Sequence, residues 1–213
     1  MAKKIMFNDK YSLTQAVLDG RKTMTRRIIK CPRTFKGEWV AGFNIHRRHS
    51  DKKIVGWPCM YDADEREFDM GEIFPKYKVG EVVAIAQSYL DLSLAEVSQW
   101  KSNGNKTTIN SLAGWTNKLF TKAELMPHHI RITNIKIEKL QGISDEDCLK
   151  EGIVQKFDAD GTPRYRVPCE KHTWAYATDS ARDAYHFLID KVSGKGTWES
   201  NPYVFVDEFE LID

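Results

Sequence analysis

Residues 19–27 form the segment of this chain with the clearest potential for chemistry. They read Asp-Gly-Arg-Lys-Thr-Met-Thr-Arg-Arg, so one lysine, two hydroxyls and three arginines fall within seven positions. Guanidinium and ammonium groups bind phosphates and carboxylates, and a lysine with a lowered pKa can also act as a base. The segment could therefore hold an anionic or nucleotide-like ligand and act on it. Taken alone, the local pattern favours a simpler structure, a solvated basic strand end.

Two predicted elements position these side chains. Ser12 and Gln15 form a capping-box pattern, which predicts a helix that ends at Gly20, where glycine permits a left-handed stop. A strand is predicted over residues 25–30, and the glycine bend before it lets Lys22 and Thr25 converge at its start. Because side chains alternate between the two faces of a strand, one face should take Thr23, Thr25 and Arg27, and the other Lys22, Met24 and Arg26.

The spacing of apolar residues elsewhere predicts an α+β fold built on a small curved sheet or barrel with flanking helices. Ile130–Leu140 alternates clearly, and a slip in its spacing predicts a bulge at Thr133-Asn134. We expect one sheet to contain residues 4–8, 25–30, 82–87, 130–140 and 203–212, with the helices 12–20 and 181–192 packed outside it.

Weaker patterns lie between these elements. Residues 37–60 predict a hairpin of two runs, Glu38–Ile45 and Lys53–Tyr61. The acidic residues 62–72 are expected to form a loop, and residues 155–178 a loop or an irregular hairpin. Helices are predicted over Leu92–Lys101 and, after capping residue Ser144, over Asp145–Lys150.

The composition is typical of a folded soluble protein. The 213 residues are 41% hydrophobic and 29% charged, which fits one substantial domain. The first 60 residues hold fourteen Lys and Arg against four Asp and Glu, a bias that permits binding of a polyanion. The four cysteines are widely spaced, which predicts reduced thiols. No segment has the apolar length of a membrane helix, so we expect a cytoplasmic protein without membrane contacts.

Four segments, in this order, resemble the ASCH domain, a PUA-like β-barrel family. They are Gln15–Arg27 with G-R-K-T-x-T-R, Val79–Gln87 with V-G-E-V-V, Ile130–Gly152 with a strand and an acidic helix ending in E-G, and Gly194–Leu211 with G-K-G-T-W-x-x-N-P. The order of the segments and the last motif are most similar to ASCH proteins of phages and prophages. The resemblance implies one domain over residues 1–213, with insertions at 31–76 and 88–126.

This resemblance also implies functions. ASCH and PUA-like domains bind RNA or modified nucleobases, and some small bacterial members hydrolyse the amide of N4-acetylcytidine with a Lys, a Thr and a Glu. The matching motifs place these residues at Lys22, Thr25 and Glu151. Those enzymes are much shorter than this chain, so the insertions could cover or reshape the pocket. Other ASCH proteins are ribonucleases.

Amide hydrolysis would require a neutral lysine. Partial burial and the nearby Arg21 and Arg26 would lower the pKa of Lys22, and Thr25 would be the nucleophile or would position a water. Glu151 would orient the lysine or transfer a proton, yet a close ion pair would raise the pKa of Lys22 and oppose its role as base. Because Lys22 and Glu151 lie at element ends, we expect exposed side chains whose replacement leaves the melting temperature nearly unchanged.

Other residues are expected to contact the ligand. Tyr89, just past the strand at 82–87, is the best candidate to stack on a base. Arg21, Thr23, Arg26 and Arg27 are expected to contribute further contacts. Cys169-x-x-His172 and His46-x-x-His49 lack a matching second pair, which favours isolated thiols and surface histidines over a metal site. We expect neither a metal nor a cofactor.

These observations leave three classes of function open. The first is a module that binds RNA or a modified nucleoside, favoured because a positive cleft needs less exact geometry than catalysis. The second is a hydrolase, either an amidohydrolase on such a nucleoside or a ribonuclease. The third is a phage accessory protein with a protein partner. If the basic N-terminal third binds RNA, replacing Arg26 or Arg27 should each remove about one phosphate contact from the salt dependence.

Overall fold

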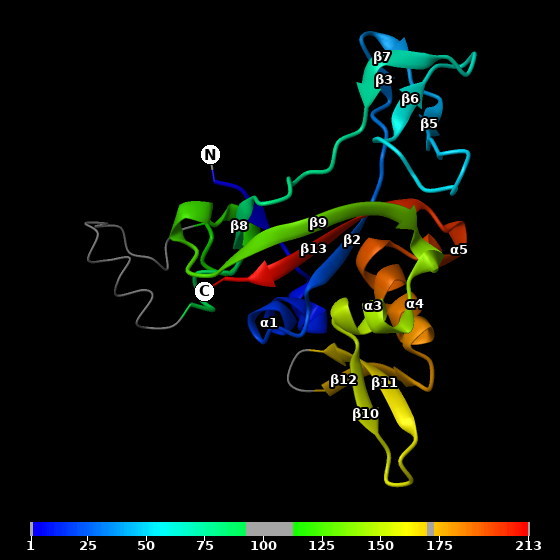
Figure 1. The fold of residues 1–213 in the computed structure, drawn as a ribbon. Helices are drawn as coiled ribbons and strands as arrows, with labels where there is room; N and C mark the ends of the chain where they lie inside the picture. The colour runs from blue at the N-terminus through cyan, green and yellow to red at the C-terminus, as the bar shows by residue number, and fades with distance from the viewer. Residues whose placement is uncertain (1, 93–112, 170–172, 213) are drawn as a thin grey trace.

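The computed structural model describes residues 2–92, 113–169 and 173–212. Its main feature is a five-stranded sheet with the strand order β1-β8-β9-β13-β2. All five segments predicted to share a sheet do so, in an α+β architecture (Figure 1). The strands are β1 (Lys4–Ile5), β2 (Met24–Ile28), β8 (Val82–Ile85), β9 (His129–Lys139) and β13 (Tyr203–Leu211).

The long antiparallel pair β9 and β13 forms the centre of this sheet. Their register shifts between Glu208 and Phe209, which pair with Asn134 and Ile132, so Thr133 is the extra residue. This confirms the predicted bulge. On its other side β13 pairs with β2.

Helices pack against the sheet, and in the described part they are α1 (Leu13–Leu18), α3 (Asp145–Lys150), α4 (Ala181–Ser193) and α5 (Thr197–Ser200). Leu13 of α1 and Leu188 of α4 share one apolar core with Val204 and Val206 of β13. The two helices expected outside the sheet are therefore confirmed. The helix predicted over Leu92–Lys101 falls almost entirely on residues outside the described part.

Helix starts differ in how they are capped. The hydroxyls of Ser144 and Ser180 accept hydrogen bonds from the backbone N–H groups of Asp147 and Asp183, at 3.1 and 3.2 Å. The capping box predicted at Ser12 was wrong. Ser12 has a φ of +53° and its hydroxyl donates to the carbonyl of Cys169 at 3.1 Å, so a contact distant in sequence replaces the local cap.

Three smaller sheets flank the main one. The hairpin predicted within 37–60 is confirmed only in part, because residues 42–44 pair with 59–61 and residues 53–58 lie outside any strand. Glu38 and Trp39 pair with an earlier strand instead. The loop predicted at 62–72 is confirmed for residues 62–66 and was wrong for residues 67–72, which form a strand on the edge of that hairpin. The sheets are β3 (Thr34–Phe35) with β4 (Glu38–Trp39), β5 (Gly42–Asn44) with β6 (Cys59–Tyr61) and β7 (Glu67–Glu72), and β10 (Val154–Phe157) with β11 (Pro163–Cys169) and β12 (Thr173–Thr178).

Short 3₁₀ turns complete the described elements. They are η1 (Asp9–Tyr11), η3 (Lys118–Phe120), η4 (Ala123–Leu125) and η5 (Leu140–Gly142). Among the described residues, no helix has both the length and the apolar character needed to span a bilayer.

The five-stranded sheet is open rather than closed into a barrel. Strands β1 and β2 lie at opposite ends of the strand order, and no pairing between them occurs in the described part of the chain. The strand pairing therefore supports the predicted small sheet and not the predicted barrel. A pocket instead lies between the free edge of β2 and the segment Met6–Asn8 that follows β1.

Candidate functional site

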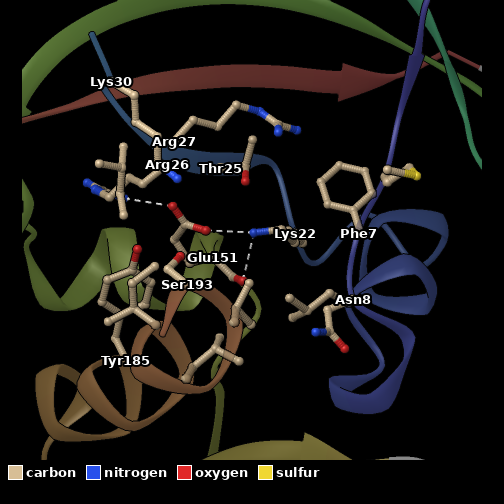
Figure 2. A pocket seen from close by; sticks show the side chains of 16 residues that line it. Phe7, Asn8, Lys22, Thr25, Arg26, Arg27, Lys30, Glu151, Tyr185 and Ser193 are labelled. Atoms are coloured by element: carbon tan, nitrogen blue, oxygen red, sulfur yellow. Dashed lines mark hydrogen bonds and ion pairs between the residues drawn. The ribbon is translucent and has the colours of Figure 1, made fainter. Parts of the chain in front are cut away.

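This pocket, which we call the Lys22 pocket, encloses about 400 Å³ and brings together residues from both ends of the chain (Figure 2). Its volume lies within the range of small-molecule sites, which is about 300–1,000 Å³. One wall comes from β2, another from α4, and the floor from the end of α3. The lining residues are Met6, Phe7, Asn8, Leu13, Lys22, Thr25, Arg26, Arg27, Ile28, Lys30, Glu151, Tyr185, Leu188, Ile189, Val192 and Ser193.

Lys22 lies at the bottom of the pocket and is 1% exposed. Its Nζ donates to Glu151 Oε2 at 2.6 Å, to the Glu151 carbonyl at 2.9 Å and to the Met24 carbonyl at 2.7 Å. Three acceptors therefore meet the three N–H groups of an ammonium. Glu151 is 4% exposed. The expectation that these two charged side chains are exposed was wrong, because α4 and the Met6–Asn8 segment cover the ends of the elements that carry them.

Backbone geometry on both sides forces this pair together. Gly20 takes a φ of +70° as predicted, and the Lys22 N–H then bonds to the Ala16 carbonyl at 2.8 Å, which turns the chain back over α1. Glu151 is the C-terminal cap of α3. The next residue, Gly152, has a φ of +106°, and a Cβ there would lie 3.0 Å from Leu13 Cδ2. Glycine at this position lets α3 end against α1 and directs Glu151 toward Lys22.

The electrostatics of the pair resolve a conflict that the sequence left open. Burial lowers the pKa of Lys22, and the attraction and hydrogen bond of Glu151 raise it by less, so the pKa is lower than that of an ordinary lysine. Arg27 and Arg26 lower it further. An ion pair with Glu151 is thus compatible with a lysine that gives up its proton more readily.

Arg26 contacts the second carboxylate oxygen of Glu151 from the buried side of the pocket. Its side chain is fully buried, and Nη1 lies 3.2 Å from Glu151 Oε1. Nη2 also lies 2.6 Å from Glu138 Oε1 and 3.0 Å from Asp147 Oδ2. Burial opposes the charge, but Glu151, Tyr185 and Glu138 raise the pKa of Arg26 above its ordinary value. Its guanidinium is therefore already paired with carboxylates on several sides, which leaves it poorly placed for the phosphate contact expected from the sequence.

Thr25 and Tyr185 supply hydroxyl groups to the pocket. Figure 2 shows the Thr25 side chain on β2 pointing toward Lys22 and Glu151. Tyr185 rises from α4 and is 1% exposed, and its hydroxyl has no hydrogen-bond partner among the described residues. Burial raises the pKa of Tyr185 well above its usual value, so the phenol stays protonated. A neutral O–H without a partner at a pocket wall is suited to bind a polar ligand atom.

The remaining predicted ligand residues divide between the pocket and other places. Arg27 lines the pocket and its guanidinium lies 5.5 Å from the centre of the Tyr77 ring. Arg21 is exposed and pairs with Asp19 at 2.9 Å. Thr23 lies outside the pocket lining, and its backbone joins α3 to β13. Tyr89 is buried in a separate cluster, where its hydroxyl accepts from the Lys122 N–H, so the structure does not bring it to this pocket.

Sequence reasoning missed four residues around this centre, namely Glu138, Asp147, Tyr185 and Asp207. Tyr185 lies within the predicted helix 181–192, where its hydroxyl was the available signal for something other than packing. Glu138 and Asp147 gave no such signal, since an acidic residue on an alternating strand or in a first helical turn is usually solvated. Only the tertiary structure turns them toward Arg26.

Asp207 on β13 is buried opposite Thr25. Its nearest cation is Arg27, whose Nε lies 3.4 Å from Oδ2, and both carboxylate oxygens lack a hydrogen-bond partner in the described part of the chain. Burial outweighs the attraction of Arg27, and together with the charge of Glu151 it raises the pKa of Asp207 to about 6. The charged form of this residue is therefore costly at neutral pH.

The free energy of unfolding should consequently fall as rising pH deprotonates Asp207. A carboxyl whose pKa is raised from 3.8 to about 6 adds stability below pH 3.8 that is lost as the pH rises through 6. Relative to Asp207→Asn, the wild type should lose on the order of 2 kcal/mol of unfolding free energy between pH 4 and pH 7. Urea unfolding of both proteins across this range tests the prediction, and a constant difference would contradict it.

No group of three or more metal-ligating side chains occurs among the described residues. His46 instead lies 2.9 Å from Glu67. His172, from one of the two spacings considered, lies outside the described part. Comparisons of the chain with protein-family models, with curated proteins and with solved structures found no match.

Proposed function

We propose that the Lys22 pocket binds a modified nucleoside and hydrolyses an amide on its base, as in N4-acetylcytidine. The observation that carries this proposal is the convergence of Lys22, Thr25 and Glu151 in one pocket. Glu151 lies far from Lys22 and Thr25 in the sequence, and the resemblance to ASCH amidohydrolases selected all three from sequence motifs alone. A PUA-like origin of the curved sheet belongs to the same proposal.

In this mechanism Lys22 is the base and Thr25 the nucleophile. Neutral Lys22 takes the proton of the Thr25 hydroxyl while Oγ1 bonds to the acetyl carbon. The bond from that carbon to the base nitrogen then breaks, and Lys22 returns the proton to the leaving amine. Water hydrolyses the resulting threonine ester, giving its proton through Lys22 to Thr25 and releasing acetate. Glu151 holds the amine in place throughout.

The arrangement of charges in the pocket favours a catalytic site over a site that only binds its ligand. A site that only binds phosphate needs accessible cations, yet Lys22 and Arg26 are buried and paired with carboxylates. A base needs a lowered pKa, which burial gives to Lys22. The exposed Lys30 and the partly exposed Arg27 remain at the pocket wall to attract an anionic group.

Incubation of the purified protein with N4-acetylcytidine, followed by chromatography of cytidine and acetate, tests the proposal. The wild type should release both products in equal amounts. Glu151→Gln and Thr25→Ala should lower kcat by about a hundredfold or more, because each loses a group of the reacting centre. Thr25→Ser should keep part of the activity because it retains a hydroxyl.

Arg21→Ala is the matched control, since it removes a nearby arginine that is exposed and lies outside the pocket. Its activity should equal that of the wild type. If the wild type binds the nucleoside through the same residues without turnover, the hydrolase proposal fails and a nucleoside-binding or RNA-binding module stands in its place.

A further inference from the structure

A second groove, which we call the arm groove, lies between the loop 47–57 and the end of β9. It encloses about 730 Å³. Its walls carry five basic side chains against two acidic ones, together with the half-buried Trp57. The basic residues are Arg47, Lys52, Lys53, Lys136 and Lys139.

The two acidic residues of the groove already have other partners. Asp51 accepts from the Lys53 backbone N–H at 3.1 Å and lies 3.3 Å from Arg48. Glu138 is held by the buried Arg26 at 2.6 Å. Lys52 and Lys53 are exposed and form no ion pair within the described ranges. Lys136 is also paired, with Glu138, Asp147 and Glu208. The surplus of positive charge in the groove therefore comes from its other four basic residues.

Aromatic contacts fix this loop on the main sheet. The Trp57 ring lies 6.0 Å from that of Phe205, and Phe43 lies 6.3 Å from Tyr203, both on β13. In Figure 1 strands β5, β6 and β7 stand above β9 and β13, while β10, β11 and β12 lie at the opposite end of the molecule. The basic loop thus has a defined place against the sheet.

Strand register connects the arm groove to the Lys22 pocket. Ile137 of the groove pairs with Phe205, which in turn pairs with Arg27 of the pocket. Residues directly opposite each other in antiparallel strands point to the same face of the sheet. Two strand spacings are about 10 Å, so Ile137 of the groove and Arg27 of the pocket wall are neighbours on one face. Arg26 and α4 lie on the opposite face, so a bound strand reaches the rest of the pocket around the free edge of β2.

We propose that the arm groove binds the backbone of a single-stranded polynucleotide, one nucleotide of which enters the Lys22 pocket. A row of cations beside an aromatic ring matches the alternation of phosphates and bases along such a strand. Only the second part of this statement rests on the function proposed above. The groove gives this chain a means to act on a nucleoside within a polymer rather than on the free nucleoside alone.

Salt-dependent binding of a fluorescein-labelled twelve-nucleotide oligouridylate, followed by fluorescence anisotropy, tests the groove without any chemistry. The full chain carrying Lys52→Asn and Lys53→Gln is compared with the wild type. Asparagine is chosen because Lys52 has a φ of +58°, which asparagine tolerates. The log–log salt slope should become shallower by about 1.4, or about 0.7 for each phosphate contact. Lys156→Gln with Lys195→Gln removes the same charge from exposed positions outside the groove and should leave the slope unchanged.

The outcomes separate this inference from the proposed hydrolase. If groove variants alter oligonucleotide binding while the wild type does not hydrolyse acetylcytidine, the groove stands and the hydrolase falls. If turnover occurs but both double variants have the same slope as the wild type, the groove proposal is wrong. Displacement of the oligonucleotide by polyglutamate of equal charge, at equal concentration, would assign the groove to an acidic polypeptide and also overturn it.

Discussion

Replacing Lys22 with Met is expected to abolish amide hydrolysis and to lower the free energy of unfolding by about 3–5 kcal/mol. The variant keeps the length of the side chain but removes Nζ, so the Glu151 carboxylate loses a 2.6 Å partner in an interior site. The two carbonyls of Met24 and Glu151 lose their donor as well. Urea unfolding and acetylcytidine turnover measure the two effects. The stability loss reverses the expectation from sequence that replacing this lysine is harmless.

Two further variants separate the charge from the packing. Lys30→Met removes an exposed lysine from the wall of the same pocket and should change stability by less than about 0.5 kcal/mol. The double variant Lys22→Met with Glu151→Gln should recover part of the loss, because it leaves no uncompensated carboxylate. If Lys22→Met unfolds like the wild type, the buried ion pair does not exist in solution.

The sequence was sufficient for the parts of the fold that local periodicity determines. Alternation in residues 130–140 identified the longest pair of strands and even its bulge, because each extra residue shifts apolar side chains to the wrong face. Apolar spacing also predicted α4, because residues three and four positions apart lie on the same face of a helix. Ser12 shows the limit, since its short pattern predicts a cap but its hydroxyl bonds to Cys169, which no local rule connects to it.

The sequence predicted which residues form the candidate site but not how they are buried. The motifs selected Lys22, Thr25 and Glu151, but nothing in them indicated that Met6–Asn8 and α4 would enclose the lysine. Burial depends on what distant segments cover, and it changes both the pKa and the stability role of a charged residue. Tyr89 illustrates the opposite error. Its position after β8 suggested a ligand contact, whereas its ring packs with Ala84 and Met126.

Replacing Arg26 with Met is expected to destabilise the protein at least as strongly as the lysine variant, by about 3–5 kcal/mol at pH 7. Glu138, Asp147 and Glu151 converge on this one guanidinium in a site that excludes solvent from it. Without it their charges repel one another, and Glu151 keeps only Lys22. The change should also displace Glu151, so acetylcytidine turnover should fall although Arg26 does not touch the reacting atoms in the proposed mechanism.

The pH dependence distinguishes this electrostatic effect from a simple loss of packing. Burial opposes the charge of Asp147, but the hydrogen bond from Arg26 and nearby cations lower its pKa below 3.8. A carboxylate with a lowered pKa contributes stability above pH 3.8 that is lost as the pH falls through its value in the folded protein. The wild type loses this contribution in acid, whereas Arg26→Met lacks most of it already. Unfolding free energies of the two proteins should therefore converge below about pH 4. A difference that stays constant from pH 7 to pH 3 would mean that Arg26 stabilises the core by its packing, and that the carboxylates need no cation there.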